Sequence, residues 1–224
     1  MTQTWTEVDR WFDTSLSLDD EHLCAALAAS AAAGLPAISV SATQGRLLNL
    51  LARQCNARRI LEIGTLGGYS GLWLGRALPA DGMLVTLELD PAHAAVAQAT
   101  FARAGLADRT DVRVGPAIET LPRLAGEGAA PFDFTFIDAD KASTPQYLDW
   151  AIRLSRPGAF IVVDNVVRNG AVLLASSPDA SVQGVRRTIA MLGSDPRVEA
   201  TAIQTVGNKG YDGFALAMVL ATGG

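Results

Sequence analysis

Cysteine and histidine are scarce in this sequence, which has two residues of each among 224. A disulfide framework is therefore disfavoured, and so is a metal site built from clustered cysteines and histidines. Cys24 and Cys55 each lie in an apolar, helix-like stretch, and we interpret them as two buried thiols. His22 and His93 lie on helical segments with no cysteine or second histidine nearby, and we interpret them as surface or packing residues.

Long apolar runs and an excess of basic charge are also missing. No stretch reaches the roughly 18 uninterrupted apolar residues that a membrane helix needs, and the acidic first twenty residues contain no signal-peptide core. Lys and Arg total 18 against 23 Asp and Glu, so the net charge of −5 disfavours nucleic acid as a partner. We expect a cytoplasmic protein that binds neither a membrane nor nucleic acid.

Apolar residues and glycine are plentiful. Hydrophobic residues make up 49% of the chain and charged residues 18%, so a sizeable core can form. The 21 glycines permit tight turns and a close approach of the backbone to a ligand. This length suits a single domain spanning residues 1–224.

Two helices are expected before the first strand. Residues 18–33 form an alanine-rich helical pattern after a Ser17 cap, and Gly34 and Pro36 end it. Residues 43–55 carry leucines at helical spacing. The N-terminal part is therefore predicted to be helical.

Short apolar runs then alternate with helical segments, at residues 59–63, 83–89, 112–115, 132–137 and 159–164. Such alternation predicts an α/β fold, a Rossmann-like doubly wound and mostly parallel sheet with helices on both faces. Two further runs, residues 197–206 and 214–220, are too close together for a helical crossover. They are predicted to pair as a C-terminal antiparallel hairpin that completes seven strands.

One segment is predicted to be mobile. Residues 169–181 mix Gly, Ser, Pro and Asp, which is typical of a loop.

The first two strand ends carry the features of a nucleoside site. Ligands of doubly wound sheets bind beyond the carboxyl ends of the strands. Residues 61–70, LEIGTLGGYS, have the spacing Gly-x-x-Gly-Gly and not the G-x-G-x-x-G of dinucleotide sites. Glu62 beside this loop suits a cationic ligand without phosphate, and Glu88 could accept hydrogen bonds from both hydroxyls of a ribose. The sequence thus predicts an adenosine-containing ligand.

The next two strand ends carry oxygen donors. Asp138 ends the fourth strand within FIDADK, and Asp164 and Asn165 end the fifth. If these strands are neighbours about 4.8 Å apart, two carboxylates and one amide oxygen converge. A hard divalent cation such as Mg²⁺ would relieve the repulsion between the carboxylates and leave coordination positions for a substrate.

Taken together, these segments resemble the class I, cation-dependent O-methyltransferases, the family of caffeoyl-CoA and catechol O-methyltransferases and their small bacterial relatives. The similar motifs are residues 61–65 with 68–70, residues 88–91, residues 136–141, Asp164-Asn165 and Asp212-Gly213. The resemblance implies a class I S-adenosylmethionine-dependent methyltransferase fold, with a helical segment at residues 1–37 and a catalytic core at residues 38–224. It also implies a homodimer.

The resemblance further implies a role for each matching residue. Those that would line the S-adenosylmethionine pocket are Val40, Glu62, Gly64, Leu66, Gly68, Ser70, Glu88, Ala117 and Asp138. Asp138, Asp164 and Asn165 would hold Mg²⁺ or another divalent cation such as Mn²⁺ or Ca²⁺. Lys141 would be the general base that deprotonates a small phenolic substrate of catechol type. Thr144 and Arg168 stand where many relatives carry aromatic residues, so the substrate-facing surface differs here.

Two other functions compete with this one. An NAD(P)-dependent oxidoreductase on the same sheet would also use Glu88, but it explains neither Asp138 with Asp164-Asn165 nor the absence of G-x-G-x-x-G. A non-catalytic nucleotide-binding protein would have no need of Lys141 and the expected metal ligands. The fold alone does not separate the three.

Overall fold

The computed structural model describes residues 2–221, so residue 1 and residues 222–224 of the expected domain lie outside the described part. Its strands are β1 (Arg59–Ile63), β2 (Met83–Glu88), β3 (Thr110–Val114), β4 (Phe132–Ile137), β5 (Ser155–Asp164), β6 (Val198–Gly207) and β7 (Gly210–Val219). Its helices are α1 (Thr2–Ser15), α2 (Glu21–Ala32), α3 (Ala42–Gln54), α4 (Tyr69–Gly75), α5 (Pro91–Arg103), α6 (Ala117–Gly126), α7 (Thr144–Leu154) and α8 (Ala180–Ser194). Two short 3₁₀ helices are η1 (Ala107–Arg109) and η2 (Arg168–Leu173).

The described strands form one seven-stranded sheet in the order β3-β2-β1-β4-β5-β7-β6. The β1–β5 pairings are parallel, and β7 runs antiparallel to both β5 and β6. The predicted doubly wound sheet with a C-terminal hairpin is therefore confirmed. The strand order reverses beside β1, and this is where a doubly wound sheet opens a crevice for a ligand.

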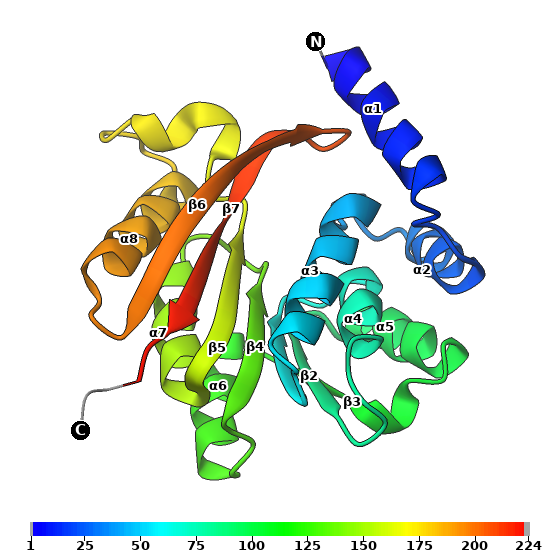
Figure 1. Ribbon diagram of the computed structural model, residues 1–224, viewed down its shortest axis with the longest axis horizontal. Helices are drawn as coiled ribbons and strands as arrows, with labels where there is room; N and C mark the ends of the chain where they lie inside the picture. Colours follow the sequence, from blue (N-terminus) through cyan, green and yellow to red (C-terminus); the bar gives the residue numbers. More distant parts are fainter. Residues whose placement is uncertain (1, 222–224) are drawn as a thin grey trace.

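Helices cover both faces of the sheet (Figure 1). Along β1, Ile60 packs with buried residues of α3, α4 and α5, whereas Leu61 and Ile63 pack with those of α6, α7 and α8. This alternation follows from the two-residue period of a strand. Glu62 points to the same face as Ile60, so its carboxylate lies in the apolar layer under α4.

The prediction of two helices before β1 is wrong, because α1 precedes them. Figure 1 shows α1 extending away from the body of the molecule, with the tip of the β6–β7 hairpin reaching toward it. Asp9 of α1 accepts a hydrogen bond from the Asn208 backbone N–H at 2.6 Å, from the far end of the chain. The predicted Ser17 cap is also wrong: Asp20 caps α2 through the His22 and Leu23 backbone N–H groups.

The hairpin is tighter than predicted. Residues 207–213 were expected to form the loop, but Gly207 pairs with Gly210 and β7 begins at Gly210. Asn208 and Lys209 alone form the turn. The Lys209 side chain extends from this turn, and its ammonium donates a hydrogen bond to the Ala37 backbone oxygen at 3.0 Å.

The remaining expectations concern the thiols and residues 169–181. Both cysteines are free, but Cys24 is exposed and only Cys55 is partly buried, so the prediction of two buried thiols is wrong for Cys24. Part of the 169–181 segment forms η2, and the Gln183 side chain bonds the backbone oxygens of Ala175 and Ser177 at 2.9 Å. Its mobility stays a prediction.

None of the helices described in residues 2–221 is long and apolar enough to cross a membrane.

Candidate active site

The largest cavity at the strand ends has a volume of about 760 Å³ and lies beyond β1, β2 and β4. A volume of this size is typical of cofactor sites. The sequence-predicted residues that line it are Val40, Gly64, Leu66, Ser70, Glu88, Ala117, Asp138, Lys141 and Asn165. Glu62, Gly68 and Asp164 do not line this cavity. We refer to it as the larger cavity.

Glu88 is held rigidly at the end of β2. One carboxylate oxygen accepts hydrogen bonds from the backbone N–H groups of Thr65 at 3.2 Å and Leu66 at 2.7 Å, and the other accepts from that of Asp90 at 2.9 Å. Leu66 has a positive φ of 49°, an uncommon conformation that these bonds help to maintain. The carboxylate thus fixes the β1–α4 loop and keeps its remaining lone pairs for a ligand.

Glu62 lies behind the wall of the larger cavity. Its carboxylate is fully buried and accepts hydrogen bonds from the Ser70 hydroxyl at 2.7 Å and the Thr86 hydroxyl at 2.6 Å. Burial raises the pKa of Glu62 to about 7, although both hydroxyl donors oppose the shift. Ser70 lines the cavity, so its hydroxyl connects Glu62 to the space where a ligand would bind.

Glycine lets the ends of β1 and β4 touch. Gly64 has a φ of +100°, and a Cβ atom there would lie 2.3 Å from the backbone oxygen of Asp138. Any side chain would therefore separate the β1–α4 loop from Asp138. Gly68 has a φ of +85° at the N-terminus of α4, so its contribution is to the conformation of the loop.

Lys141 and Asp138 form an ion pair in the cavity wall, with the Lys141 Nζ atom donating to an Asp138 carboxylate oxygen at 2.7 Å. Only 9% of the Lys141 side chain is exposed. Asp140, which lies between these two residues in the sequence, does not join the pair. Its carboxylate instead accepts hydrogen bonds from the Tyr147 hydroxyl at 2.7 Å and the Ser143 backbone N–H at 2.9 Å. The pair thus holds the lysine ammonium beside Asp138.

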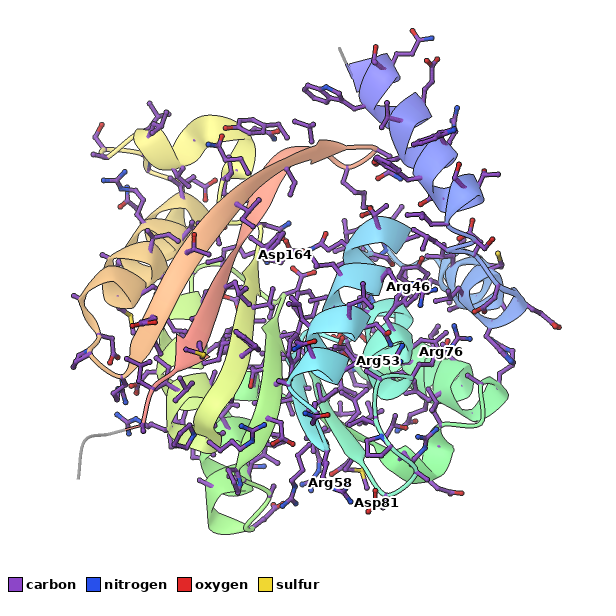
Figure 2. The ribbon with its side chains drawn as sticks, in the orientation of Figure 1. Arg46, Arg53, Arg58, Arg76, Asp81 and Asp164 are labelled. Carbon is purple, nitrogen blue, oxygen red and sulfur yellow. The ribbon has the colours of Figure 1, made fainter. Side chains whose placement is uncertain are left out.

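Asp164 lies beside this pair. Because β4 and β5 are neighbouring parallel strands, with Ile137 paired to Val163, the residues that follow emerge together as expected. Asp164 is 5% exposed, and burial raises its pKa well above the usual range. The Asp138 carboxylate raises the pKa of Asp164 further, whereas the Lys141 ammonium opposes the shift. Figure 2 shows Asp164 on the side of the sheet where α3 lies.

A smaller cavity of about 340 Å³ opens on the other side of Asp164. It is lined by residues of α1, α3, the segment before α3 and the β6–β7 hairpin. Ile38, Ser39, Val40 and Asn165 line both cavities. Asn165 has a φ of +58°, which asparagine tolerates better than most residues, and its backbone N–H donates to Asp164 at 2.8 Å.

Asp212 fixes the chain that follows Asn165. One of its carboxylate oxygens accepts the backbone N–H groups of Val167 at 2.9 Å, and of Arg168 and Gly213 at 3.0 Å. The end of β5 is thus bonded to β7. The Asp212-Gly213 motif therefore has a positioning role in this structure.

Sequence reasoning missed several residues at the site. His93 was expected to be a surface or packing residue, but it lines the larger cavity with its Nδ1 atom 3.7 Å from a Glu88 carboxylate oxygen. His93 lies near the start of α5, a few residues after Glu88, and this closeness in sequence could have indicated that it belongs to the site. Gln44 and Lys209, which line the smaller cavity, had no such signal because both reach it from distant parts of the chain.

Known proteins of similar sequence are O-methyltransferases. A family model described as O-methyltransferase matches residues 14–218. A catechol O-methyltransferase from Niastella koreensis is 54% identical over 217 residues, covering 97% of this chain and 98% of that protein. A catechol O-methyltransferase from Mycobacterium tuberculosis is 58% identical over 213 residues, covering 95% of each.

Solved structures agree with this result. An O-methyltransferase from Bacillus cereus in complex with SAH superposes with a TM-score of 0.96 at 51% identity, covering 98% of this chain and all of that one. The O-methyltransferase TomG from Streptomyces achromogenes, in complex with SAM, superposes with a TM-score of 0.95 at 53% identity and covers 98% and 99% of the two chains.

The sheet, its C-terminal hairpin and the cavity at its switch point define a class I methyltransferase fold, as the sequence predicted. The chain belongs to the O-methyltransferase family. This membership argues against the nicotinamide-dependent alternative.

Proposed function

We propose that this protein transfers the methyl group of S-adenosylmethionine to a hydroxyl of a catechol-type aromatic acceptor with the assistance of a divalent cation. The observation that carries the proposal is the position of Asn165, which lines both cavities beside Asp164. A cofactor in the larger cavity and an acceptor in the smaller one would meet at the expected cation ligands. The similar structures with bound SAH and SAM support the cofactor.

The larger cavity suits an adenosyl ligand. Glu88 would accept hydrogen bonds from the ribose hydroxyls with the lone pairs that its backbone donors leave free. Ser70 would contact the methionyl part, its hydroxyl oriented by Glu62 behind it. Val40, Gly64, Leu66, Ala117 and Asp138 would complete the wall, and Gly68 would act through the loop conformation.

The donor set at the ends of β4 and β5 fits a divalent cation. Asp138, Asp164 and Asn165 would hold Mg²⁺, Mn²⁺ or Ca²⁺, which prefer oxygen ligands. In the described part of the chain no three His, Cys, Asp or Glu side chains are placed to share a metal, so the third protein ligand would be the Asn165 amide oxygen. The bound cation would lower the pKa of an acceptor hydroxyl, while S-adenosylmethionine would supply the methyl group.

Lys141 would first lose its own proton, which the charge of a cation bound beside Asp138 favours, and its neutral amine would then take up the proton released by the acceptor hydroxyl. Its Nζ atom lies 2.7 Å from Asp138, which would stabilise the lysine ammonium once the proton has arrived. The low exposure of the side chain keeps bulk water from competing for the proton. The other contribution of the protein would be alignment of the two reacting molecules.

Incubation with S-adenosylmethionine, Mg²⁺ and a panel of catechols is expected to yield monomethylated products and SAH by mass spectrometry. The same protein is expected to bind SAH in calorimetry and to give little or no heat with NAD. Resorcinol, whose hydroxyls are not adjacent, serves as the matched negative acceptor. Tight NAD binding, or no methylation of any catechol, would contradict the proposed function.

Gly184→Ala is expected to lower kcat by about ten- to a hundredfold, since catalysis depends steeply on placement. A Cβ atom at Gly184 on α8 would lie 1.9 Å from the backbone oxygen of Lys141. The backbone that carries the proposed base must therefore shift. We expect overpacking to reduce the free energy of unfolding by about 1–3 kcal/mol. Steady-state kinetics and urea unfolding measure the two effects.

The matched control is Gly193→Ala on the same helix, where a new Cβ atom meets no other atom within 4 Å. This variant should keep its kcat and gain up to about 1 kcal/mol of stability from improved helix propensity. Equal kinetics for the two variants would show that packing against Lys141 does not position the base.

We also propose that residues 1–224 act as one catalytic domain in the cytoplasm and that the protein is a homodimer. The exposed apolar side chains of α1, among them Val8 and Trp11, support self-association because apolar surface favours burial.

A further inference from the structure

The smaller cavity is lined by polar side chains from separate parts of the chain. Asp164, Asn165 and Gln44 line it beside the expected cation ligands, and Lys209 lines it from the turn of the β6–β7 hairpin. The walls also include the apolar side chains of Phe12, Ile38, Val40, Leu47, Val206 and Phe214. An aromatic ring held between such walls can have its hydroxyls at one end and a substituent at the other.

The polar groups beside Asp164 are available to a ligand. The Gln44 amide nitrogen is buried and has no acceptor within normal hydrogen-bond geometry in the described structure. A buried donor without an acceptor is costly. A ligand oxygen beside Gln44 would remove that cost.

Lys209 is the only cationic side chain among the described residues that line the smaller cavity. Its ammonium donates one hydrogen bond, to the backbone oxygen of Ala37 at 3.0 Å, and makes no salt bridge with a described acidic residue. Partial burial lowers the pKa of Lys209, whereas the charge of Asp138 opposes the shift. Two donor hydrogens remain free.

The two acidic side chains close to this turn are already engaged. Asp9 accepts the backbone N–H of Asn208, and Asp212 accepts three backbone N–H groups near the end of β5. Both also line the smaller cavity, but neither forms a salt bridge with the Lys209 ammonium. A partly desolvated cation without an anionic partner at the wall of a ligand cavity is suited to an anionic ligand group.

We infer that Lys209 binds a carboxylate on the ring of the acceptor, so that the preferred acceptors are catechol carboxylates and not neutral catechols. This inference rests on the proposed function, because it presumes that the acceptor occupies the smaller cavity with its hydroxyls at Asp164 and Asn165. A single cation and a cavity of about 340 Å³ suit one short anionic substituent. Lys209 is then a residue that determines acceptor specificity and takes no part in methyl transfer.

The test compares protocatechuate with its methyl ester, which has the same ring and hydroxyls but no anionic charge. Methyl transfer to each is measured for the wild type, Lys209→Met and Lys209→Arg. The wild type is expected to have a KM for the acid at least about tenfold below that for the ester. The reason is that a charge-assisted hydrogen bond adds enough binding free energy to lower KM by about this factor. Lys209→Met should raise the KM for the acid about tenfold, change that for the ester less than about twofold and leave kcat largely intact.

Lys209→Arg should keep the preference for the acid, because the charge is retained. Arg123→Met removes one exposed positive charge from α6 and controls for the change in net charge. Comparing KM ratios between variants cancels the different intrinsic reactivity of the acid and the ester.

A loss of the same size for both acceptors in Lys209→Met would overturn the inference, since it would mean that Lys209 only holds the Ala37 segment. Equal KM values for acid and ester in the wild type would also overturn it, while methylation of both would leave the proposed function standing. If neither these acceptors nor catechol itself is methylated, the proposed function fails, and this inference fails with it.

Discussion

Methyl transfer to a catechol is expected to stop when EDTA removes divalent cations and to return when Mg²⁺ is added in excess. The reason is the charge distribution at the ends of β4 and β5, where the buried Asp164 carboxylate lies next to Asp138 with only the Lys141 ammonium opposing their repulsion. Such a pair of carboxylates suits a doubly charged ion. Initial rates with and without chelator measure the effect.

Two controls separate a catalytic cation from a structural one. Calorimetry should give a similar Kd for SAH with and without EDTA, because the Glu88 end of the larger cavity does not depend on the cation ligands. Mg²⁺ or Mn²⁺ should raise the Tm of the wild type but not that of Asp138→Ala, because a ligand that binds only the folded state stabilises it. Activity that is unaffected by chelator would remove the cation from the proposal.

Lys141→Met is expected to lower kcat by roughly 10²–10⁴, the usual contribution of a positioned general base. Methionine is close to lysine in shape but cannot accept a proton, and Lys209, the only other lysine, does not line the larger cavity that contains Lys141. Lys141→Arg should be equally impaired, since a guanidinium stays protonated. Single-turnover rates measured across a pH series provide the readout.

The binding of SAH should survive both Lys141 substitutions, and calorimetry tests this. The residual activity should keep rising with pH, because only solvent base remains to take the proton. A variant that retains most of the wild-type kcat would show that Lys141 does not act as the base, whatever its effect on folding.

The strand ends were the part of the site most accessible from sequence. Asp164 follows the continuous apolar run at residues 159–163, which is typical of a strand buried on both faces, and Asp138 follows residues 132–137, in which only Asp133 and Thr135 are polar. Parallel strands bring their carboxyl ends to one edge of the sheet, so a pattern of local runs predicted a convergence of distant residues. The motifs at residues 61–70 and 136–141 could be recognised in the sequence because each lies at the carboxyl end of a predicted strand.

The predictions from sequence were wrong where contacts between distant parts of the chain determine the local structure. Helix α1 is polar overall and only partly buried, and Asp9 connects it to the distant hairpin turn by a hydrogen bond. Glu62 was expected at the cavity wall, and the structure has it behind Ser70 because the strand alternation turns its side chain under α4. The importance of Gly184 depends on how closely α8 packs against Lys141.

The sequence by itself determined the class of fold, the order of strands and helices along the core and the oxygen donors at the strand ends. Those features depend on side-chain periodicity and on residues that are close together in the chain. Only the tertiary structure decided that Lys209, Gln44 and Phe12 share one cavity and that Asn165 joins it to the larger one. Such groupings depend on packing between elements far apart in sequence, and no local pattern of residues encodes them.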